Sequence, residues 1–236
     1  MKYVVLPERG IRRLSFYLAM EEYVARQFDE ADLFFLWHVE PSVIFGRNQA
    51  VEAEVNVDYC REHDIKIYRR KSGGGCVYAD KDNLMLSYVS SEENVNFAFN
   101  TFIGMIILVL RRIGIEAVGT SHNDVLIADK KVCGTACYHL PGKSVVHSTM
   151  LYDTNMEHML NAITPSKEKL EQKGIKSVRQ RITLLKDYTS MSFDELQSHI
   201  RSTLCNGELL LSADDVAAIE KLEESYLTEE FINLIP

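Results

Sequence analysis

The chain has 236 residues, of which 46% are hydrophobic and 25% are charged, so it holds enough apolar side chains for a substantial core. Its formal net charge of -8 argues against a nucleic-acid groove. The first residues meet a charge and a proline before any apolar stretch of secretory length, and the most apolar window, residues 102–110, is too short to cross a bilayer. We therefore expect no nucleic-acid partner and no membrane partner.

The cysteines are scattered along the chain without a C-x-x-C pair, which argues against both a disulfide framework and a zinc site. We therefore expect a reducing compartment, the cytoplasm. The five cysteines are Cys60, Cys76, Cys133, Cys137 and Cys205.

The first half of the chain mixes helical and strand-like patterns. Apolar residues at helical spacing predict a first helix over residues 14–28, capped near Ser15. Short apolar or β-branched runs predict strands over residues 32–39, 42–46, 65–70, 76–79 and 84–90. A helix over residues 55–64 is expected among these strands.

The second half begins with a helix over residues 96–114 that ends at a glycine. Two strands within residues 124–140, joined by a turn at Asp129 and Lys130, and a further strand over residues 144–153 follow. From Ser166 on the pattern is helical, with Ser192 and Glu195 in a capping box. We expect a single α+β (mixed α/β) domain over residues 1–236, with a helical part from about 166 to 236 whose acidic stretch, residues 220–230, is solvated.

Residues 69–80, RRKSGGGCVYAD, place three consecutive glycines between two strands. Glycine reaches positive φ without steric cost and lets main-chain N–H groups approach a ligand. The stretch is therefore either a flexible cover over a phosphate or an acyl chain, with Arg70 and Ser72 donating to anionic oxygens, or a tight hairpin turn. It is neither a Walker A loop nor a Rossmann fingerprint, because no G-K-[ST] ends it and strand residues follow it.

Two further stretches carry polar residues beside strands. In residues 121–136, SHNDVLIADKKVCGTA, a lysine next to a Gly-Thr pair can neutralise a carboxylate and a phosphoryl oxygen together. Asn123 and Asp124 there can hold a hydroxyl or a metal-bound phosphate. The alternative is a surface hairpin with solvated Lys130 and Lys131. In residues 145–153, VVHSTMLYD, His147 lies on an apolar strand, where a histidine is more often a satisfied core residue than a catalyst.

These three stretches, in this order, resemble motifs of the lipoate-protein ligase family, relatives of the biotin protein ligases. Residues 69–80 are similar to R-R-x-S-G-G-G-x-V-[YF]-H-D, residues 121–136 to G-R-N-D-[LV]-x-x-x-x-x-K-[VI]-S-G-[ST]-A, and residues 145–151 to x-x-H-G-T-L-L. Residues 33–49 and 161–185 also resemble family segments. The likeness runs from about residue 14 to the end of the chain.

The resemblance implies a biotin/lipoate ligase-like catalytic domain with a mixed, mainly antiparallel sheet flanked by helices. It implies that ATP, with Mg2+, and lipoate give lipoyl-AMP and pyrophosphate, after which a lysine of an apo lipoyl domain accepts the lipoyl group. The acceptor would belong to a 2-oxoacid dehydrogenase or be the glycine-cleavage H protein. Neither the preference for lipoate over octanoate nor the oligomeric state follows from the sequence.

The resemblance also assigns residues to roles. Lys131 is the catalytic residue, because a cation between a carboxylate and the α-phosphate lowers their repulsion and stabilises the transferring group. Ser72, Gly73 and Gly74 are expected over the acyl tail, Asn123 and Asp124 near the ribose, phosphate or Mg2+, and His147 close to the acyl pocket without a proton-transfer role. ATP is expected to contact Lys131 and also Arg70, Gly75, Cys76, Val77, Tyr78 and Gly134.

The sequence departs from the family pattern at four positions. Ala79 and His122 stand where the family has His and Arg, so each removes a polar or cationic group near the nucleotide. Cys133 and Ser148 replace Ser and Gly and are expected to change only the shape of the pocket. The chain ends where bacterial members continue into a small accessory domain, so we expect that a separate accessory domain protein is needed for adenylation, or that preformed lipoyl-AMP is the substrate.

Two alternatives remain. An octanoyl or lipoyl transferase of the same fold works through a cysteine thioester, and Cys76, Cys133 and Cys137 lie near the predicted site, although none occupies the position of a transferase nucleophile. A non-catalytic lipoate-binding protein is the second alternative, because the changes at Ala79 and His122 are compatible with lost chemistry.

Overall fold

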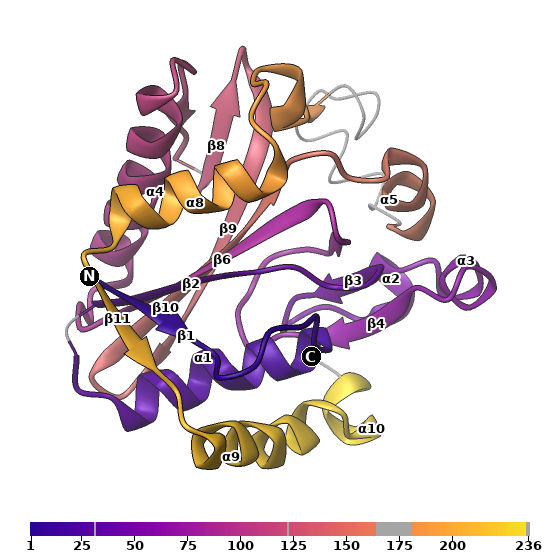
Figure 1. Ribbon diagram of the computed structural model, residues 1–236. Helices are drawn as coiled ribbons and strands as arrows, with labels where there is room; N and C mark the ends of the chain where they lie inside the picture. The colour runs from indigo at the N-terminus through magenta and orange to yellow at the C-terminus, as the bar shows by residue number, and fades with distance from the viewer. Residues whose placement is uncertain (31, 122, 164–180, 235–236) are drawn as a thin grey trace.

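A computed structural model describes residues 1–30, 32–121, 123–163 and 181–234. Its larger sheet has eight strands in the order β11-β1-β2-β6-β10-β9-β8-β7, and its smaller sheet has three in the order β4-β3-β5 (Figure 1). The strands of the larger sheet are β1 (Lys2–Val5), β2 (Asp32–Trp37), β6 (Asn83–Ser90), β7 (Val118–Gly119), β8 (Asp124–Ile127), β9 (Lys130–Leu140), β10 (Lys143–Leu151) and β11 (Gly207–Leu210). Those of the smaller sheet are β3 (Ser42–Phe45), β4 (Lys66–Arg69) and β5 (Val77–Ala79).

The pairing confirms the predicted mixed, mainly antiparallel sheet. In the larger sheet β1 runs parallel to β11 and β2, and the remaining pairs are antiparallel. In the smaller sheet β3 is parallel to β4 and antiparallel to β5.

Helices cover both faces of the larger sheet (Figure 1). One side carries α1 (Leu14–Gln27) and α9 (Ala213–Glu223), and the other carries α4 (Val95–Arg112) and α8 (Phe193–Leu204). The shorter helices are α2 (Val51–Glu54), α3 (Val57–Glu62), α5 (Met156–Ala162), α10 (Glu229–Ile232) and the 3-10 turns Leu185–Asp187 and Glu224–Tyr226.

Strand alternation divides the buried side chains of the larger sheet into two cores, one on each face. On β2, Phe35 and Trp37 pack with α1, whereas Phe34 packs with α4. On β10, Val145 belongs to the α1 side and Val146 to the α4 side. His147 is on the same face of β10 as Val145, because successive strand residues point to opposite faces. The acyl pocket that the resemblance places beside His147 is therefore expected on the α1 side of the sheet.

The small sheet packs against this α1 side. Its residues Ile44 and Tyr68 join the core under α1, whereas Val43 and Phe45 pack with α3 and α5. The turn after β4 thus emerges where the α1-side core meets the small sheet, and this turn carries the three glycines.

The helix α4 is, within the described part of the chain, the one helix long and apolar enough to span a membrane by length and composition. Its residues Phe102, Ile106 and Leu110 are completely buried in the α4-side core, while Phe97 and Leu108 on its outer face are exposed.

Four details of the sequence prediction are wrong. The N-cap of α1 is Arg13, and Ser15 instead donates to Glu223 of α9 at 2.5 Å. The turn between β8 and β9 is Ala128–Asp129, both at positive φ (47° and 62°), as a type I′ two-residue hairpin requires.

The other two concern the end of the chain. The region after Ser166 contains the strand β11 as well as helices, because residues 207–210 pair with β1. The acidic stretch is not wholly solvated, since Glu223 is 3% exposed. The capping box of Ser192 and Glu195 is confirmed, and the predicted helical residues 166–180 lie outside the described part.

Candidate active site

A cavity of about 470 Å³ lies between the α1 side of the larger sheet and the small sheet. Its lining residues come from the strands β2, β3, β5, β6, β8, β9 and β10, from the helices α1, α2 and α5, and from the turn between β4 and β5. Its lining includes a charged group, Asp124, Lys131 and Arg181, and an apolar group, Leu18, Trp37, Ile44 and Met85. A ligand with an anionic part and an apolar part therefore suits it. A surface groove of about 800 Å³ between the start of α1 and α9 holds none of the predicted site residues.

Asp124 binds two cations in the charged group. Its Oδ1 lies 2.7 Å from Lys131 Nζ, and its Oδ2 lies 2.9 Å from Arg181 Nη2. The Asp124 side chain is 10% exposed, whereas those of Lys131 and Arg181 are 26% and 32% exposed. Two cations against one carboxylate leave net positive charge, and this charge attracts an anion more strongly here than in bulk water.

A β-bulge in β9 turns Lys131 toward the cavity. Val125 pairs with Cys133 but Leu126 pairs with Lys131, so β9 has one extra residue between these pairs. As a result Val132 and Cys133 both pack into the α4-side core. Strict alternation would have placed Lys131 on the same side as Cys133, so the bulge is what brings its amine to Asp124.

Arg70 holds the glycine loop, residues 72–75, from inside the protein. Its Nη2 donates to the carbonyls of Gly73 (2.7 Å) and Gly75 (2.8 Å), its Nη1 to that of Ile44 (2.9 Å), and its Nε to Ser72 Oγ (2.9 Å). Burial lowers the pKa of Arg70 to about 10, which leaves the guanidinium charged at neutral pH. Of its five N–H groups these contacts use four, so Arg70 mainly supports the loop.

Two glycines allow the glycine loop to take this conformation. Gly74 has φ +93°, and a Cβ at Gly46 would lie 2.0 Å from the carbonyl oxygen of Gly74. Arg47 N also donates to the carbonyl of Ser72 at 2.9 Å. Gly73, in contrast, has nothing within 4 Å of its missing Cβ. The positive φ therefore explains the glycine at position 74, and the close approach of the turn after β3 explains the glycine at position 46. The structure shows no steric need for three consecutive residues without side chains.

Most predicted site residues line the cavity. Those that do so are Arg70, Gly74, Gly75, Cys76, Val77, Tyr78, Asp124, Lys131, Gly134 and His147. Ser72, Gly73 and Asn123 do not. Ser72 is completely buried and contacts Arg70 and His147 instead. Asn123 has φ 61°, and its carbonyl accepts hydrogen bonds from Thr135 N and Oγ1, so its backbone shapes the turn before β8.

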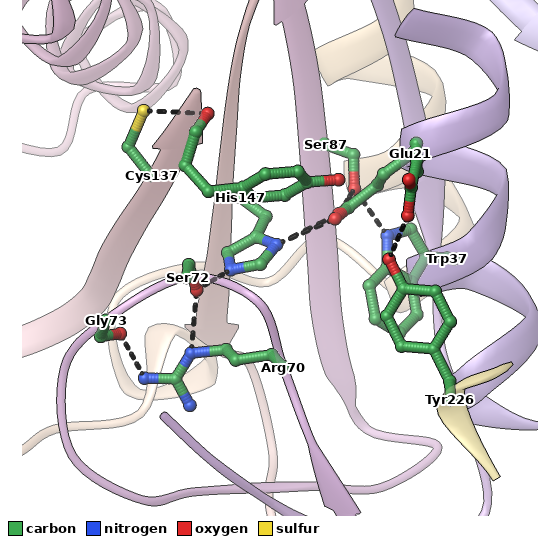
Figure 2. Close-up of polar contacts among 11 residues, drawn as sticks. Glu21, Trp37, Arg70, Ser72, Gly73, Ser87, Cys137, His147 and Tyr226 are labelled. Atoms are coloured by element: carbon green, nitrogen blue, oxygen red, sulfur yellow. Dashed lines mark hydrogen bonds and ion pairs between the residues drawn. The ribbon is translucent and has the colours of Figure 1, made fainter. Parts of the chain in front are cut away.

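His147 lies between Ser72 and Glu21 (Figure 2). Its Nε2 is 2.7 Å from Ser72 Oγ, and its Nδ1 is 2.9 Å from the Glu21 carboxylate. The ring lines the cavity but is only 7% exposed, and both of its nitrogens have protein partners. This geometry fits a positioned residue better than a proton-transfer catalyst.

Sequence reasoning missed three charged residues at the site. Arg181 binds Asp124, Glu54 accepts a hydrogen bond from Cys76 N at 2.9 Å and lines the cavity, and Glu21 contacts His147. Arg181 lies in the segment 161–185 that resembles the family, which was the available signal. Glu54 and Glu21 lie on helices whose sequence patterns give no sign of a partner.

The cysteines differ in their access to the cavity. All five lie in the described part of the chain as free thiols, and Cys76 is the one that lines the cavity. Burial raises the pKa of Cys133 to about 11 and that of Cys137 to about 12. A thiol with so high a pKa is a poor nucleophile at neutral pH, so a thioester mechanism would depend on Cys76.

The four departures from the family pattern lie in different surroundings. Ala79 is completely buried in the α1-side core and does not line the cavity. The substitution of the family's His by Ala79 therefore does not remove a polar group from the cavity wall. Ser148 lines the cavity, while Cys133 is buried behind it. His122 lies outside the described residues.

Comparison with known proteins agrees with this geometry. Residues 14–205 match the family described as lipoyl protein ligase A/B catalytic domain. Lipoate-protein ligase LplJ of Bacillus subtilis is 34% identical over 193 residues, which are 80% of this chain and 58% of LplJ. The chain therefore spans less than two thirds of that relative.

Solved structures share the fold over the whole chain. A structure from an archaeal lipoylation system, a bi-partite lipoate protein ligase and its E2 lipoyl domain from Thermoplasma acidophilum, has a TM-score of 0.86 and 27% identity and covers 100% of this chain and 98% of that one. Lipoate-protein ligase A bound with ATP has a TM-score of 0.85 and 24% identity, with 100% of both chains covered. Family match, identity and fold agree, and the chain belongs to the lipoyl protein ligase A/B catalytic domain family.

Proposed function

We propose that the chain is the catalytic domain of a lipoate-protein ligase. It would join lipoate to AMP at the expense of ATP and then pass the lipoyl group to a lysine of an apo lipoyl domain. One observation carries the proposal: Lys131 and Arg181 are held together by Asp124 in the same cavity as the apolar side chains and the glycine loop.

The charged group suits the first step. The lipoate carboxylate attacks the α-phosphorus of ATP, pyrophosphate leaves, and two anions must approach each other. The ammonium of Lys131 and the guanidinium of Arg181 can lie against both anions and lower this repulsion. In the second step the acceptor amine attacks the carbonyl of the mixed anhydride, AMP leaves, and an amide is formed.

The substrates follow from the cavity and the relatives. The apolar group of side chains suits the chain and ring of lipoate, and the named relatives are lipoate-protein ligases. ATP as the second substrate is supported by the ATP-bound ligase of the same fold. Of the sequence-predicted residues, we propose Arg70, Gly74 to Tyr78, Asp124, Gly134 and His147 as the binding wall and Lys131 as the catalytic residue.

Mg2+ would enter with the phosphates of ATP. No cluster of three metal-ligating side chains occurs among the residues that the structure describes. The cavity does offer two carboxylates, Asp124 and Glu54, and Mg2+ in nucleotide sites is commonly held by one or two carboxylates plus phosphate oxygens. The donor set therefore fits a metal that arrives with its nucleotide.

The proposed partners are an apo lipoyl domain and a separate accessory domain protein. The Thermoplasma ligase is bi-partite and was studied with its E2 lipoyl domain, which supports both partners for this chain. The acceptor would be a lipoyl domain of a 2-oxoacid dehydrogenase or the glycine-cleavage H protein. We place the reaction in the cytoplasm, where free thiols such as the five present here persist.

The test uses the pure protein, ATP, Mg2+, lipoate and an apo lipoyl domain, with and without a candidate accessory domain. Mass spectrometry should show one lipoyl group on the acceptor, and lipoyl-AMP should form from ATP only with the accessory domain. Lipoyl-AMP made unaided would contradict the need for that partner. No modification under any of these conditions, including supply of preformed lipoyl-AMP, would contradict the ligase.

Lys131→Ala tests the catalytic residue, with Lys130→Ala as the matched control. Both lysines are on β9, but Lys130 is exposed and does not line the cavity. We expect Lys131→Ala to lower turnover roughly 100-fold with a smaller change in lipoate affinity, and Lys130→Ala to change neither. A non-catalytic lipoate-binding protein would instead bind lipoate with no turnover in the unaltered chain.

A cysteine thioester mechanism is the second candidate, because Cys76 lines the cavity. Cys76→Ser should retain transfer if the adenylate mechanism holds, since the variant keeps the backbone N–H of Cys76 that donates to Glu54. Loss of transfer in this variant, together with an acyl adduct on Cys76 in the unaltered protein, would favour the thioester.

A further inference from the structure

Glu21 is a buried carboxylate behind the cavity wall. It lies on α1, is 0% exposed and does not line the cavity. Ser87 Oγ donates to it at 2.5 Å, and His147 Nδ1 lies 2.9 and 3.1 Å from its two oxygens. A carboxylate in this position is costly unless its lone pairs are used and its charge is compensated.

The hydrogen bonds around Glu21 (Figure 2) indicate the tautomer of His147. Trp37 Nε1–H donates to Ser87 Oγ at 2.8 Å, so the Ser87 hydroxyl donates onward to Glu21. The carboxylate is an acceptor, and His147 must therefore present Nδ1–H to it. In the neutral imidazole Nε2 then accepts a hydrogen bond.

The acceptor at Nε2 in turn orients Ser72 and Arg70. Arg70 Nε–H donates to Ser72 Oγ at 2.9 Å, and the Ser72 hydroxyl donates to His147 Nε2 at 2.7 Å. In this series of hydrogen bonds each donor therefore meets one acceptor group. With the proton on Nε2 instead, His147 would compete with Arg70 for Ser72 Oγ, and the lone pair of Nδ1 would face the carboxylate of Glu21.

The same series of hydrogen bonds joins two buried charges of opposite sign. Arg70 is 5% exposed and Glu21 is 0% exposed, and the side chains of Ser72 and His147 connect them. Arg70 uses its other N–H groups on Ile44 and on the glycine loop. The position of the glycine loop is therefore tied, through Ser72 and His147, to a carboxylate on the first helix.

We propose that Glu21 is a positioning residue of this site: by accepting a hydrogen bond from His147 Nδ1–H it fixes the imidazole, Ser72 and Arg70, and so holds the glycine loop against the cavity. The hydrogen-bonded chain stands on geometry alone, and its effect on acyl binding rests on the proposed ligase function. Glu21 touches no substrate in this arrangement and acts through His147.

The test compares Glu21→Gln, which keeps an acceptor oxygen of similar size, with Glu21→Met, which keeps only the volume. Glu22→Gln is the matched control, because Glu22 is a buried carboxylate on the same helix turn that contacts Lys71 and Tyr226 but not His147. The readouts are the tautomer of His147 from long-range 1H–15N NMR spectra, assigned with His147→Phe, and hydrogen exchange of the backbone amides of residues 72–76.

We expect the Nδ1–H tautomer in the unaltered protein, in Glu21→Gln and in Glu22→Gln. In Glu21→Met the tautomer should change, exchange in the glycine loop should speed up roughly tenfold, and the KM for lipoate should rise roughly tenfold with little change in kcat. An unchanged tautomer and loop in Glu21→Met would overturn the proposal, and so would an equal defect in Glu21→Gln, because the charge rather than the acceptor would then matter.

Ser72→Ala is a second, independent cut in the chain, and it serves if Glu21→Met fails to fold. It should free the glycine loop while His147 keeps its Nδ1–H tautomer. If the backbone amides of the glycine loop exchanged at the same rate as in the unaltered protein, the proposed series of hydrogen bonds would be contradicted. The NMR and exchange readouts need no ligase activity, so inactivity of the unaltered protein would contradict the proposed function and leave the positioning role separately tested.

Discussion

At position 134 a side chain would collide with the amine of Lys131. A Cβ there would lie 2.5 Å from Lys131 Nζ and 2.6 Å from its Cε. Because the end of a lysine side chain is mobile, Gly134→Ala should displace the amine from Asp124 rather than unfold the sheet. We expect turnover to fall roughly 100-fold, as misplacement by about 1 Å can do, with little change in melting temperature.

A control for this prediction is Gly104→Ala on the exposed side of α4, where nothing lies within 4 Å of the missing Cβ. It should raise stability by about 0.5–1 kcal/mol, because alanine is the better helix residue, and leave turnover unchanged. If Gly134→Ala keeps full turnover, the contact between Lys131 and Asp124 is not required for the reaction.

Single residues were predictable where a motif named them and not where a fold brings them together. Lys131 and Asp124 lie seven positions apart within residues 121–136, and both line the cavity. Arg181 is 57 positions from Asp124 and Glu21 is 126 positions from His147, so no local pattern links them. Ser72 shows the opposite case, because its motif predicts a ligand contact, whereas its hydroxyl has protein partners in the structure.

At the scale of elements, Arg69 fastens the last helix, α10, to the small sheet. It is 1% exposed and stacks 4.6 Å from the ring centre of Phe45. Its guanidinium donates to the carbonyls of Ile232 (3.0 Å), Leu234 (2.7 Å) and Arg47 (2.5 Å). Arg69→Met would leave these carbonyls without their donor.

We expect Arg69→Met to lower the free energy of unfolding by about 2–4 kcal/mol and to speed hydrogen exchange in residues 229–234, measured by urea denaturation and mass spectrometry. Arg61→Met is the control, because Arg61 makes an exposed contact with Asp58 at 3.2 Å, which contributes about 0.5 kcal/mol or less. Equal losses in the two variants would show that α10 is held by other contacts.

The elements themselves were largely predictable, and their pairing was not. Periodicity located α1, α4, α8 and most strands, because each buries one face on a large core. The strands β1 and β11 were missed, since four residues each carry too little pattern and they are held as strands by pairing with each other and with β2. The bulge before Cys133 was also invisible, yet it decides which way Lys131 points.

At the scale of the whole molecule, residues 69–72 connect the cavity with the end of the chain. Arg70 and Ser72 belong to the hydrogen bonds that hold the glycine loop and His147 beside the cavity. Arg69 and Lys71 instead contact the C-terminal region. Lys71 lies 4.7 Å from the ring centre of Tyr226. Side chains that alternate along an extended segment thus place the two networks on opposite sides of one backbone.

Glu22 completes the second of these networks. Its carboxylate accepts hydrogen bonds from Lys71 Nζ (2.6 Å), Tyr226 Oη (2.8 Å) and Arg26 Nη2 (2.9 Å). Burial alone would raise the pKa of Glu22, but these hydrogen bonds and the charge of Lys71 outweigh burial and lower it. The ionised form of Glu22 is therefore bound more strongly in the folded protein than in the unfolded chain.

This sign predicts how stability depends on pH. Because the folded pKa of Glu22 lies below its unfolded value, its contribution is complete above about pH 5 and is lost as the pH falls through the folded pKa. Glu22→Gln should therefore cost about 2 kcal/mol in urea unfolding at pH 7, and the gap to the unaltered protein should close as the pH falls below about 4. Asp80, whose pKa is raised by burial, has the opposite pH dependence but is present in both proteins and cancels in the difference. If the difference in free energy of unfolding between the two proteins stayed constant from pH 7 to pH 3.5, the negative charge of Glu22 would not stabilise the contacts between the first helix, Lys71 and the C-terminal region.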